Sequence, residues 1–348
     1  MLDGSHTQDG DRLRKAIMLY LHGLGHFYPE NIITNRLLSE LDIGSSEEWI
    51  LERVGIVTRH TVLPLDYIKA TKNNDIRGAM KANLYNNAQT AAAAARLAIE
   101  RAGIRKEDIG LLICGCSAPD YASPAEASRV AAELGIEVPC FDMNSACTSF
   151  GVQIHFLGMM KPEALPPYIL TVTPENLTRS VDYSDRSSAC LFGDGSTAAV
   201  LSLTVPSRMK FVGTHFCAKP SAWDKVGIPR MGYFSQDGNA VQGFAIRKTT
   251  EALRTLQAAY PSSMNGHLKF IGHQANLGML EMVCERCGID PGNHWHNVVE
   301  YGNTASAGAP GALSLHWGEI QPDDHIAVVQ VGAGLSWAHM MLIVEGNR

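Results

Sequence analysis

The stretch AQTAAAAARLAIERAGI (88–104), followed by IGLLICGCSA (109–118), decides the fold class of this 348-residue chain. The first segment is rich in alanine and closes at Gly103, which is typical of a helix ended by a left-handed glycine. The second segment is a continuous apolar run, as expected for a strand that is covered on both faces. Helix and strand in alternation indicate an α/β protein.

A second helix is predicted over SPAEASRVAAELGI (123–136), and the strand-like VPCFDM (138–143) follows it. We expect Ser123 to be the N-cap of this helix, Pro124 its first residue, and Glu126 the partner that completes a capping box.

The same order of elements occurs twice along the chain. Residues 88–172 read as helix, strand, helix, strand, a loop with Cys147, helix and strand. Residues 241–345 repeat this order through FAIRKTTEALRTLQAA, LKFIGHQ, a helix ending in ERCGI, strand-like HNVVEYG, a loop with Asn303, a helix and HIAVVQVG. We infer a duplicated α/β unit, with halves at 17–203 and 204–348 after a disordered or tag-like leader at 1–16. Equivalent loops of the two halves then meet near a pseudo-twofold axis.

Composition excludes several classes of protein. The net charge is −6 and no run of basic residues stands out, so a nucleic-acid-binding surface is not suggested. No apolar stretch has the length of a membrane span, and the first fifteen residues lack the apolar region of a secretory signal. Most of the eight cysteines sit in apolar runs. We therefore expect a cytoplasmic protein with reduced thiols rather than a disulfide framework.

Cys147 is the candidate nucleophile. It lies in FDMNSACTSFGVQIHFL (141–157), where a strand ends, small residues follow and an apolar helix begins. The helix dipole favours thiolate at a helix N-terminus, and thiolate is the form that attacks a thioester carbonyl. We expect a lowered pKa for this thiol. The alternative is a buried cysteine that serves as a small apolar residue.

His273 and Asn303 are candidate partners of Cys147 from the second half. His273 directly follows an apolar strand, in FIGHQANLGM (270–279), and Asn303 lies in EYGNTASAG (300–308), where glycine permits close backbone approach. A histidine and an asparagine can both donate hydrogen bonds to one oxygen and so stabilise a developing enolate or tetrahedral oxyanion. For each residue taken alone, an ordinary polar loop residue is the favoured interpretation.

Four segments together resemble one family. They are SSEEWILERVGIVTRH (45–60), DMNSACTSF (142–150), SDRSSACLFGDGSTAAVL (184–201), and HQAN (273–276) followed by GNT (302–304). The chain resembles the β-ketoacyl-acyl-carrier-protein synthase III enzymes of the thiolase-like superfamily. This resemblance implies a five-layer αβαβα fold. It also implies an acyl-Cys147 intermediate and decarboxylative Claisen condensation with a malonyl thioester, with His273 and Asn303 holding the enolate, in fatty-acid or polyketide biosynthesis.

The resemblance also implies roles for other residues. The loop VGAGLSW (331–337) would supply an oxyanion amide, for which Gly334 is the candidate. The remaining candidates bind coenzyme A: Trp49, Arg53 and Arg179 at the nucleotide, and Asn239 and Asn276 along the pantetheine tunnel. Acyl-CoA and acyl carrier protein are the implied partners, the enzyme is expected to be a homodimer, and no metal or redox cofactor is required.

Three positions depart from the family pattern. The basic residues that usually dock the carrier protein are replaced by Gly243 and Gly278, although Arg247, Lys248 and Arg286 are nearby. Ser123 stands where the family often has a bulky aromatic that floors the partner's acyl pocket. A small residue there predicts a primer longer than acetyl, or a branched or aromatic one. Residues 65–87 look longer than usual and are read as a lid, an acceptor surface or a plain insertion.

Other readings remain open at this point. In one alternative, acyl-Cys147 passes its acyl group to an alcohol, an amine or a non-malonyl carbon. In another, the chain is a non-catalytic partner in a heterodimer. Cys284 with Cys287, and His294 with His296, have the spacing of metal ligands. Both pairs lack a second pair at a suitable distance, so core packing is the preferred interpretation.

Overall fold

The structure, a computed structural model, describes residues 18–261 and 267–346. The predicted leader at 1–16 lies outside these residues. A nine-stranded sheet dominates the molecule, with the order β11-β12-β13-β8-β1-β7-β6-β4-β5. None of the helices in the described ranges is both long enough and apolar enough to cross a membrane.

The first half contributes five strands in the order β1-β7-β6-β4-β5. Their bounds are β1 (Leu19–Phe27), β4 (Ile109–Cys114), β5 (Cys140–Asp142), β6 (Tyr168–Glu175) and β7 (Gly195–Ser202). Strands β4, β5 and β6 are parallel, and β7 runs antiparallel between β6 and β1. The apolar run at 109–118 is thus a strand, as predicted, although it ends at Cys114.

The second half repeats this order as β8-β13-β12-β11. Its strands are β8 (Met209–Ala218), β11 (Leu268–Ile271), β12 (His325–Gly332) and β13 (Ser336–Val344). A fifth position is marked by a single parallel bridge between Phe270 and His294. The strand-like HNVVEYG is a correction, because residues Val298–Tyr301 form the short helix α12. The boundary predicted at 203/204 falls in the loop between β7 and β8. Within the sheet, the pairing of β1 with β8 joins the two halves.

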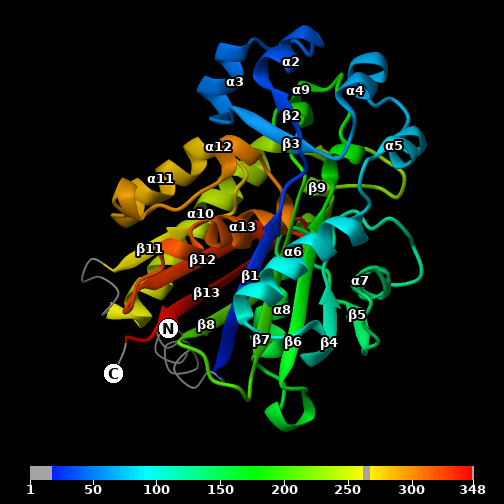
Figure 1. Cartoon of the computed structure of the whole chain (residues 1–348). Coiled ribbons are helices and arrows are strands. Elements are labelled where there is room, and N and C mark those ends of the chain that lie inside the picture. Colours follow the sequence, from blue (N-terminus) through cyan, green and yellow to red (C-terminus); the bar gives the residue numbers. More distant parts are fainter. Residues whose placement is uncertain (1–17, 262–266, 347–348) are drawn as a thin grey trace.

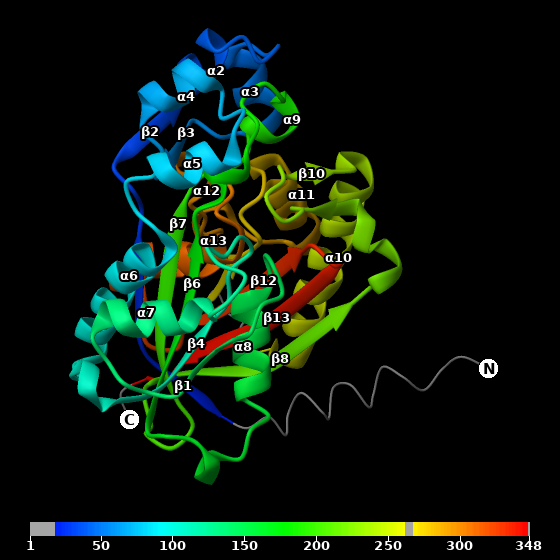
Figure 2. The same cartoon turned by 90° about the vertical axis from the view of Figure 1, so that its right-hand side faces the viewer.

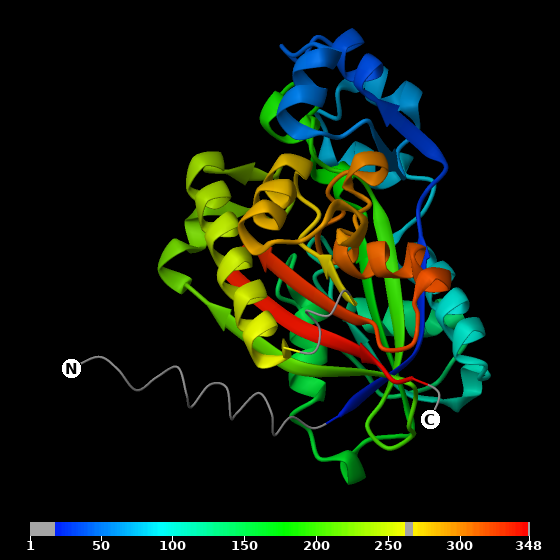
Figure 3. The ribbon, with the colours of Figure 1, turned by 90° about the vertical axis from the view of Figure 1, so that its left-hand side faces the viewer.

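Helices form three layers around the two halves of the sheet. Helices α8 (Ser149–Leu157) and α13 (Gly308–Leu315) each contact strands of both halves, so they form the middle layer and are buried on almost every side. On one outer face lie α6 (Asn87–Ala102) and α7 (Glu126–Leu134). On the other lie α10 (Gly238–Ala259) and α11 (Leu277–Cys287), and Figures 2 and 3 show these outer pairs on opposite sides of the molecule. The result is the predicted five-layer thiolase-like arrangement.

The Ala-rich face of α6 packs directly on β1. A Cβ built at Gly25 would lie 2.1 Å from the carbonyl oxygen of Ala94, and one at Gly23 would lie 2.1 Å from that of Ala98. Helix and strand therefore touch through backbone and alanine methyl groups. This close packing explains why the segment that decides the fold is so rich in small residues.

Helix α7 begins later than predicted. It starts at Glu126, and its N-cap residue Ala125 makes no side-chain cap. Instead, the carboxylate of Asp142, at the end of β5, accepts the backbone N–H groups of Glu126 and Ala127 at 2.9 Å each. Ser123 is exposed and does not form the expected capping box, because the carboxylate from the neighbouring strand satisfies the free N–H groups.

A smaller subdomain lies at one end of the sheet, at the top of Figure 1. It consists of β2 (Asn31–Thr34), β3 (Thr58–Thr61), α2 (Asn35–Glu40), α3 (Glu47–Val54), α4 (Leu65–Thr71), α5 (Ile76–Ala82) and α9 (Arg186–Ala189). Residues 65–87 thus form α4, α5 and the start of α6. They are tied down by Asn73, whose buried amide donates to the carbonyls of Thr178, Arg179 and Val181.

Short elements complete the chain. A two-stranded ribbon of β9 (Val226–Gly227) and β10 (Ser235–Gln236) precedes α10. Single turns of 3-10 helix are η1 (Lys106–Asp108), η2 (Pro162–Ala164), η3 (Leu177–Ser180), η4 (Pro220–Lys225), η6 (Pro291–Asn293), η7 (Ala305–Ala307) and η8 (Trp317–Glu319).

Candidate active site

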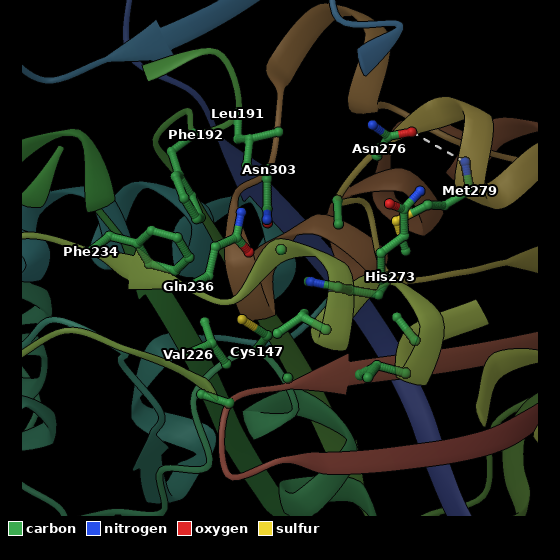
Figure 4. Close-up of a pocket in the computed structure, with 18 of the residues that line it drawn as sticks. Cys147, Leu191, Phe192, Val226, Phe234, Gln236, His273, Asn276, Met279 and Asn303 are labelled. Atoms are coloured by element: carbon green, nitrogen blue, oxygen red, sulfur yellow. Dashed lines mark hydrogen bonds between the residues drawn. The ribbon is translucent and has the colours of Figure 1, made fainter. Parts of the chain in front are cut away.

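A cavity of about 270 Å³ lies where loops of the two halves meet. Cys147, His273 and Asn303 all line it, although they are far apart in the sequence, and their side chains point into the same space (Figure 4). Most other lining residues are apolar or small: Leu191, Phe192, Val226, Phe234, Val241, Ala245, Ala275, Met279, Val331, Gly332 and Ala333. The duplicated fold therefore brings the three predicted residues together.

A tight turn between β5 and α8 presents Cys147. Ala146 adopts a left-handed conformation with φ of 46°, and its N–H donates to Oδ1 of Asn144 at 3.0 Å. Cys147 comes directly before the N-cap residue Thr148 of α8. A Cβ at Gly332 would lie 2.9 Å from Cβ of Cys147, so only glycine allows the loop after β12 to reach the nucleophile.

Cys147 is half-buried in the wall of the cavity, and its surroundings overturn the expected direction of its pKa shift. Burial, with a smaller effect from the charge of Glu175, raises the pKa of Cys147 to about 12. The backbone N–H groups of Ala333 and of Cys147 itself oppose this rise by favouring thiolate. The resting nucleophile is thus a thiol, and it needs a base to remove its proton.

His273 follows β11 and is a neutral imidazole. Burial lowers the pKa of His273 to about 4, so the ring carries no charge at neutral pH. Its Nδ1 is buried and has no hydrogen-bond partner among the described residues. The ring points into the cavity near Cys147 (Figure 4), so it can take a proton from the thiol or donate one to an oxyanion.

Asn303 is held by its backbone against a turn of the first half. Its N–H donates to the carbonyl of Leu191 at 2.8 Å, and its own carbonyl accepts from the N–H of Gly193 at 3.2 Å. Its side-chain oxygen accepts the N–H of Ala305 at 2.9 Å. The amide nitrogen makes no hydrogen bond to a described residue, and it is therefore the donor that Asn303 offers to a ligand.

In the loop after β12, the cavity is lined by Ala333 and not by the predicted Gly334. Ala333 lines the cavity and its N–H points to the Cys147 thiol, whereas Gly334 lies outside the lining. Gly334 has φ of 130° and supplies the bend after the donor. The amides of Cys147 and Ala333 thus form the pair that can hold an oxyanion.

Trp49 and Arg53 lie on α3, close to the cavity. Asn276, which lines the cavity and caps α11, donates from Nδ2 to the carbonyl of Arg53 at 3.1 Å. The guanidinium of Arg186 lies over the Trp49 ring, 5.1 Å from its centroid. Arg186, which sequence reasoning missed, thus lies beside Trp49.

Arg179, expected at the nucleotide site, lies in the interior instead. It is 2% exposed, and its Nη1 pairs with Asp120 at 2.5 Å while Nη2 donates to Asn87. Asp120 also bonds Arg129, which pairs with Glu126. This network fixes the loop that leads to Ser123, so Arg179 is a structural residue and not a ligand at the surface.

Two polar side chains that were not predicted, those of Gln242 and Gln236, also line the cavity. Asn239, at the start of α10, lines the cavity as expected, with Gln242 one turn later. Gln236, on β10, was not predicted: its amide points toward Asn303 (Figure 4), and no hydrogen bond joins this amide to a described residue. Nothing in the sequence around Gln236 marks it except the nearby Asn239.

Comparison with known proteins agrees with this geometry. The sequence profile of 3-oxoacyl-[acyl-carrier-protein] synthase III matches residues 141–220, and that of its C-terminal part matches residues 268–344. The β-ketoacyl-[acyl-carrier-protein] synthase III of Sulfurovum is 28% identical over 352 residues, covering 96% of this chain and 98% of the relative. The chain is a β-ketoacyl-acyl-carrier-protein synthase III-like condensing enzyme of the thiolase-like superfamily.

Solved structures support the same assignment. The 3-oxoacyl-[acyl-carrier-protein] synthase III of Aquifex aeolicus superposes with a TM-score of 0.82 at 26% identity, covering 93% of this chain and 99% of that one. The priming β-ketosynthase of the R1128 polyketide pathway gives 0.79 at 25% identity, covering 96% and 98%. The enzyme is thus an acyltransferase whose relatives serve both fatty-acid and polyketide routes.

Two of the basic residues near the departures noted above share one carboxylate. Gly243 lies on α10 and Gly278 on α11. Lys248 bonds Glu251 at 2.7 Å and lies over the ring of Trp337, while Arg247 approaches the same Glu251 at 3.9 Å. One carboxylate therefore partly neutralises two of the three remaining cations near this face.

The candidate metal pairs belong to the core. Cys284 and Cys287 are buried on the inner face of α11, and His294 and His296 lie beside Phe270. Within 18–261 and 267–346, no group of three or more His, Cys, Asp or Glu side chains is arranged to hold a metal ion. The geometry gives these pairs a packing role.

Proposed function

We propose that this enzyme transfers an acyl group from a thioester to Cys147 and condenses it with a malonyl-type thioester. The observation that carries this proposal is the convergence of a thiol, a neutral imidazole and an unpaired amide in one cavity. Each group matches one requirement of the reaction: a nucleophile, a proton carrier and a donor to an enolate oxygen.

In the first half-reaction the Cys147 sulfur attacks the acyl thioester carbonyl. The thiol proton passes to His273, which is neutral and able to accept it. The N–H groups of Cys147 and Ala333 hold the tetrahedral oxyanion. The bond from carbon to the leaving sulfur then breaks, and the departing thiolate takes the proton from His273.

In the second half-reaction a malonyl-type thioester enters the same cavity. The bond between its carboxylate carbon and its α-carbon breaks, and CO2 leaves. The electron pair of that bond forms an enolate, whose oxygen accepts hydrogen bonds from His273 and from the amide nitrogen of Asn303. The enolate carbon attacks the acyl-Cys147 carbonyl, the carbon–sulfur bond to Cys147 breaks, and the Cys147 thiolate takes up a proton from solvent, which restores the thiol. The product is a β-ketoacyl thioester.

The mouth of the cavity suits a coenzyme A nucleotide. The indole of Trp49 offers a flat surface, and Arg53 and Arg186 offer positive charge for phosphate. Asn239 and Asn276 border the way from there to Cys147, where a pantetheine arm would lie. Arg186 takes the place that the sequence had suggested for Arg179.

The acyl acceptor is the less constrained substrate. Acyl carrier protein is the proposed donor of the malonyl group, with docking on the α10 and α11 face through Arg247, Lys248 and Arg286. We expect a homodimer in the cytoplasm, in which exposed Ser123 reaches the partner's acyl pocket and leaves room for a longer primer. Fatty-acid or secondary-metabolite biosynthesis is the corresponding pathway class.

Intact-protein mass spectrometry tests the proposal. The enzyme is exposed to acyl-CoA thioesters from acetyl to dodecanoyl, and the mass of the adduct is recorded for wild type and Cys147→Ala. We expect an adduct with medium-chain acyl groups that is absent from the variant. Sole reaction with acetyl-CoA would contradict the proposed primer.

Release of CO2 from malonyl thioesters then separates condensation from plain acyl transfer. An acylated enzyme that releases no CO2 with malonyl-CoA or malonyl carrier protein would point to another acceptor, such as an alcohol or an amine. Absence of an adduct with every primer would instead indicate a non-catalytic partner subunit.

A further inference from the structure

Arg59, on β3, is a buried cation that has no role in the active site as described so far. Its side chain is 0% exposed. Burial lowers the pKa of Arg59 to about 10, so the guanidinium is still charged at neutral pH. Cys190 and Tyr183 lie near this charge, and no carboxylate within 18–261 and 267–346 forms an ion pair with it.

The hydrogen bonds of Arg59 go to the Cys190 carbonyl and to Asn35. Its Nε donates to the carbonyl of Cys190 at 3.0 Å, and its Nη2 donates to the same oxygen. Its Nη1 donates to Oδ1 of Asn35, at the start of α2, at 2.6 Å. A forked guanidinium thus fixes the position and direction of the Cys190 carbonyl.

That carbonyl begins the turn that grips Asn303. Leu191, the next residue, accepts the N–H of Asn303, and Gly193 donates to the carbonyl of Asn303. Phe192 and Asn303 form a parallel bridge between these two bonds. Every backbone contact that places Asn303 on the side of the first half therefore comes from residues 191–193.

Arg59 also packs against both segments that form this contact, residues 191–193 and 302–303. A Cβ at Gly302 would lie 2.9 Å from Cγ of Arg59, and one at Gly193 would lie 3.3 Å from its Cβ. The aliphatic part of the Arg59 side chain thus lies beneath Gly193 and Gly302, while its guanidinium binds the Cys190 carbonyl. Loss of this side chain would leave a hole under the contact and an unpaired carbonyl beside it.

We propose that Arg59 is the positioning residue for Asn303, holding residues 190–193 so that the Asn303 amide stays where the enolate oxygen forms. The inference rests on the proposed function, in which Asn303 serves the second half-reaction only. Cys147 and His273 depend on other elements, α8 and β11. Arg59 should therefore matter for condensation and much less for acylation.

The test measures the two half-reactions separately in Arg59→Met and Arg59→Lys. Acylation of Cys147 is followed by intact mass, and condensation by CO2 release from the preformed acyl-enzyme. In Arg59→Met we expect condensation to fall about ten- to a hundredfold while acylation stays within about twofold, because a displacement of about 1 Å has a cost of this order. Arg59→Lys should recover part of the loss, since an ammonium can still bond the Cys190 carbonyl.

Gly302→Ala is the matched variant that keeps Arg59. Its Cβ would meet the carbonyl of Leu191 at 2.7 Å and Cγ of Arg59 at 2.9 Å, so it should push the same contact apart and give the same selective loss. Asn35→Ala is the control, because it removes the hydrogen bond between Arg59 and α2 but leaves the bond to Cys190. This control should not reproduce the selective loss of condensation.

Hydrogen exchange supplies a readout that does not depend on chemistry. The N–H groups of Asn303 and Gly193 should exchange faster in Arg59→Met and in Gly302→Ala than in wild type. Equal loss of acylation and condensation, or a rise only in the KM for acyl-CoA, would overturn the proposal and assign Arg59 to the α2–α3 subdomain. If wild type itself releases no CO2, the proposed function fails, and the exchange rates alone decide the role of Arg59.

Discussion

The turn that carries Cys147 and the turn that carries Asn303 have the same local structure. In NSAC (144–147) and NTAS (303–306), an asparagine accepts the N–H of a left-handed alanine two residues later. The φ angles of these alanines, Ala146 and Ala305, are 46° and 44°. The first turn follows β5 and the second follows the short helix α12, and the turns lead into the central helices α8 and α13.

The two turns use their residues differently. In the first turn the fourth residue, Cys147, faces the cavity, and the asparagine is exposed. In the second turn the asparagine faces the cavity and is 6% exposed, while the fourth residue, Ser306, is buried and accepts the N–H of Phe150 at 2.9 Å. The asparagine–alanine bond therefore builds the backbone, and the orientation of the turn decides which side chain reaches the substrate.

The largest effect expected from this comparison is that of Asn303→Asp. A carboxylate oxygen can still accept the N–H of Ala305, so the turn is kept, but the donor to the enolate is lost. We expect condensation to fall about a hundred- to a thousandfold, as for removal of one oxyanion donor. CO2 release from malonyl thioester measures this loss.

Asn144→Asp is the matched change in the other turn. It keeps the bond to Ala146 and removes no group from the cavity, so condensation should stay close to the wild-type rate. Similar losses in the two variants would mean that both asparagines act through the backbone, and the comparison would then fail.

A smaller effect is expected at Glu175, which lies between the two turns. Its carboxyl accepts from Ser117 and from the N–H of Ser306, and its charge raises the pKa of Cys147. Burial raises the pKa of Glu175 from 4.5 to about 8. The folded state therefore keeps a proton that the unfolded state releases. The corresponding stability is complete below about pH 4.5 and is lost progressively as the pH rises through about 8.

Glu175→Gln removes this dependence. The free energy of unfolding of the variant, relative to wild type, should rise with pH by up to about 1.4 kcal/mol per unit between the two pKa values. Urea unfolding at a series of pH values measures the difference. A constant difference across this range would show that Glu175 has the same pKa folded and unfolded.

The smallest effects are expected at the two left-handed alanines. Ala146→Gly and Ala305→Gly relieve an unfavourable conformation and should each raise the free energy of unfolding by about 0.5 kcal/mol. Ala307→Gly is the control in the second turn, because Ala307 has φ of −76° and is fully buried. This control should be destabilised by about 1 kcal/mol. Urea unfolding of all three variants, measured against wild type, checks the signs.

Much of the fold was predictable because its signals are local or repeated. The Ala-rich helix at 88–104, the apolar strand that follows and the second copy of this order each have a clear pattern. The errors lie where tertiary contacts override local preference. HNVVEYG has the β-branched residues of a strand but forms α12. Ser123 has the residue type of a cap, but Asp142 caps α7 instead.

For the site, motifs identify the residue types at its centre, and only the fold supplies their surroundings. HQAN and GNT mark His273 and Asn303, and the duplication explains why they meet Cys147. The raised pKa of Cys147 depends on enclosure by distant loops, which a sequence does not show. Arg179 is buried while Arg186 lies over Trp49, and Ala333 lines the cavity while Gly334 does not. Both differences depend on the direction in which a short segment faces.

The contact between Arg186 and Trp49 has a consequence for turnover. The indole already holds a cation in the free protein, 5.1 Å from its centroid. A flat ligand that stacks on Trp49 exchanges one contact with the ring for another, so its net gain in affinity is only the difference between them. Coenzyme A that has lost its acyl group is then held weakly at Trp49, so its residence time is short. Where release of a product limits the rate, such an exchange keeps the enzyme fast.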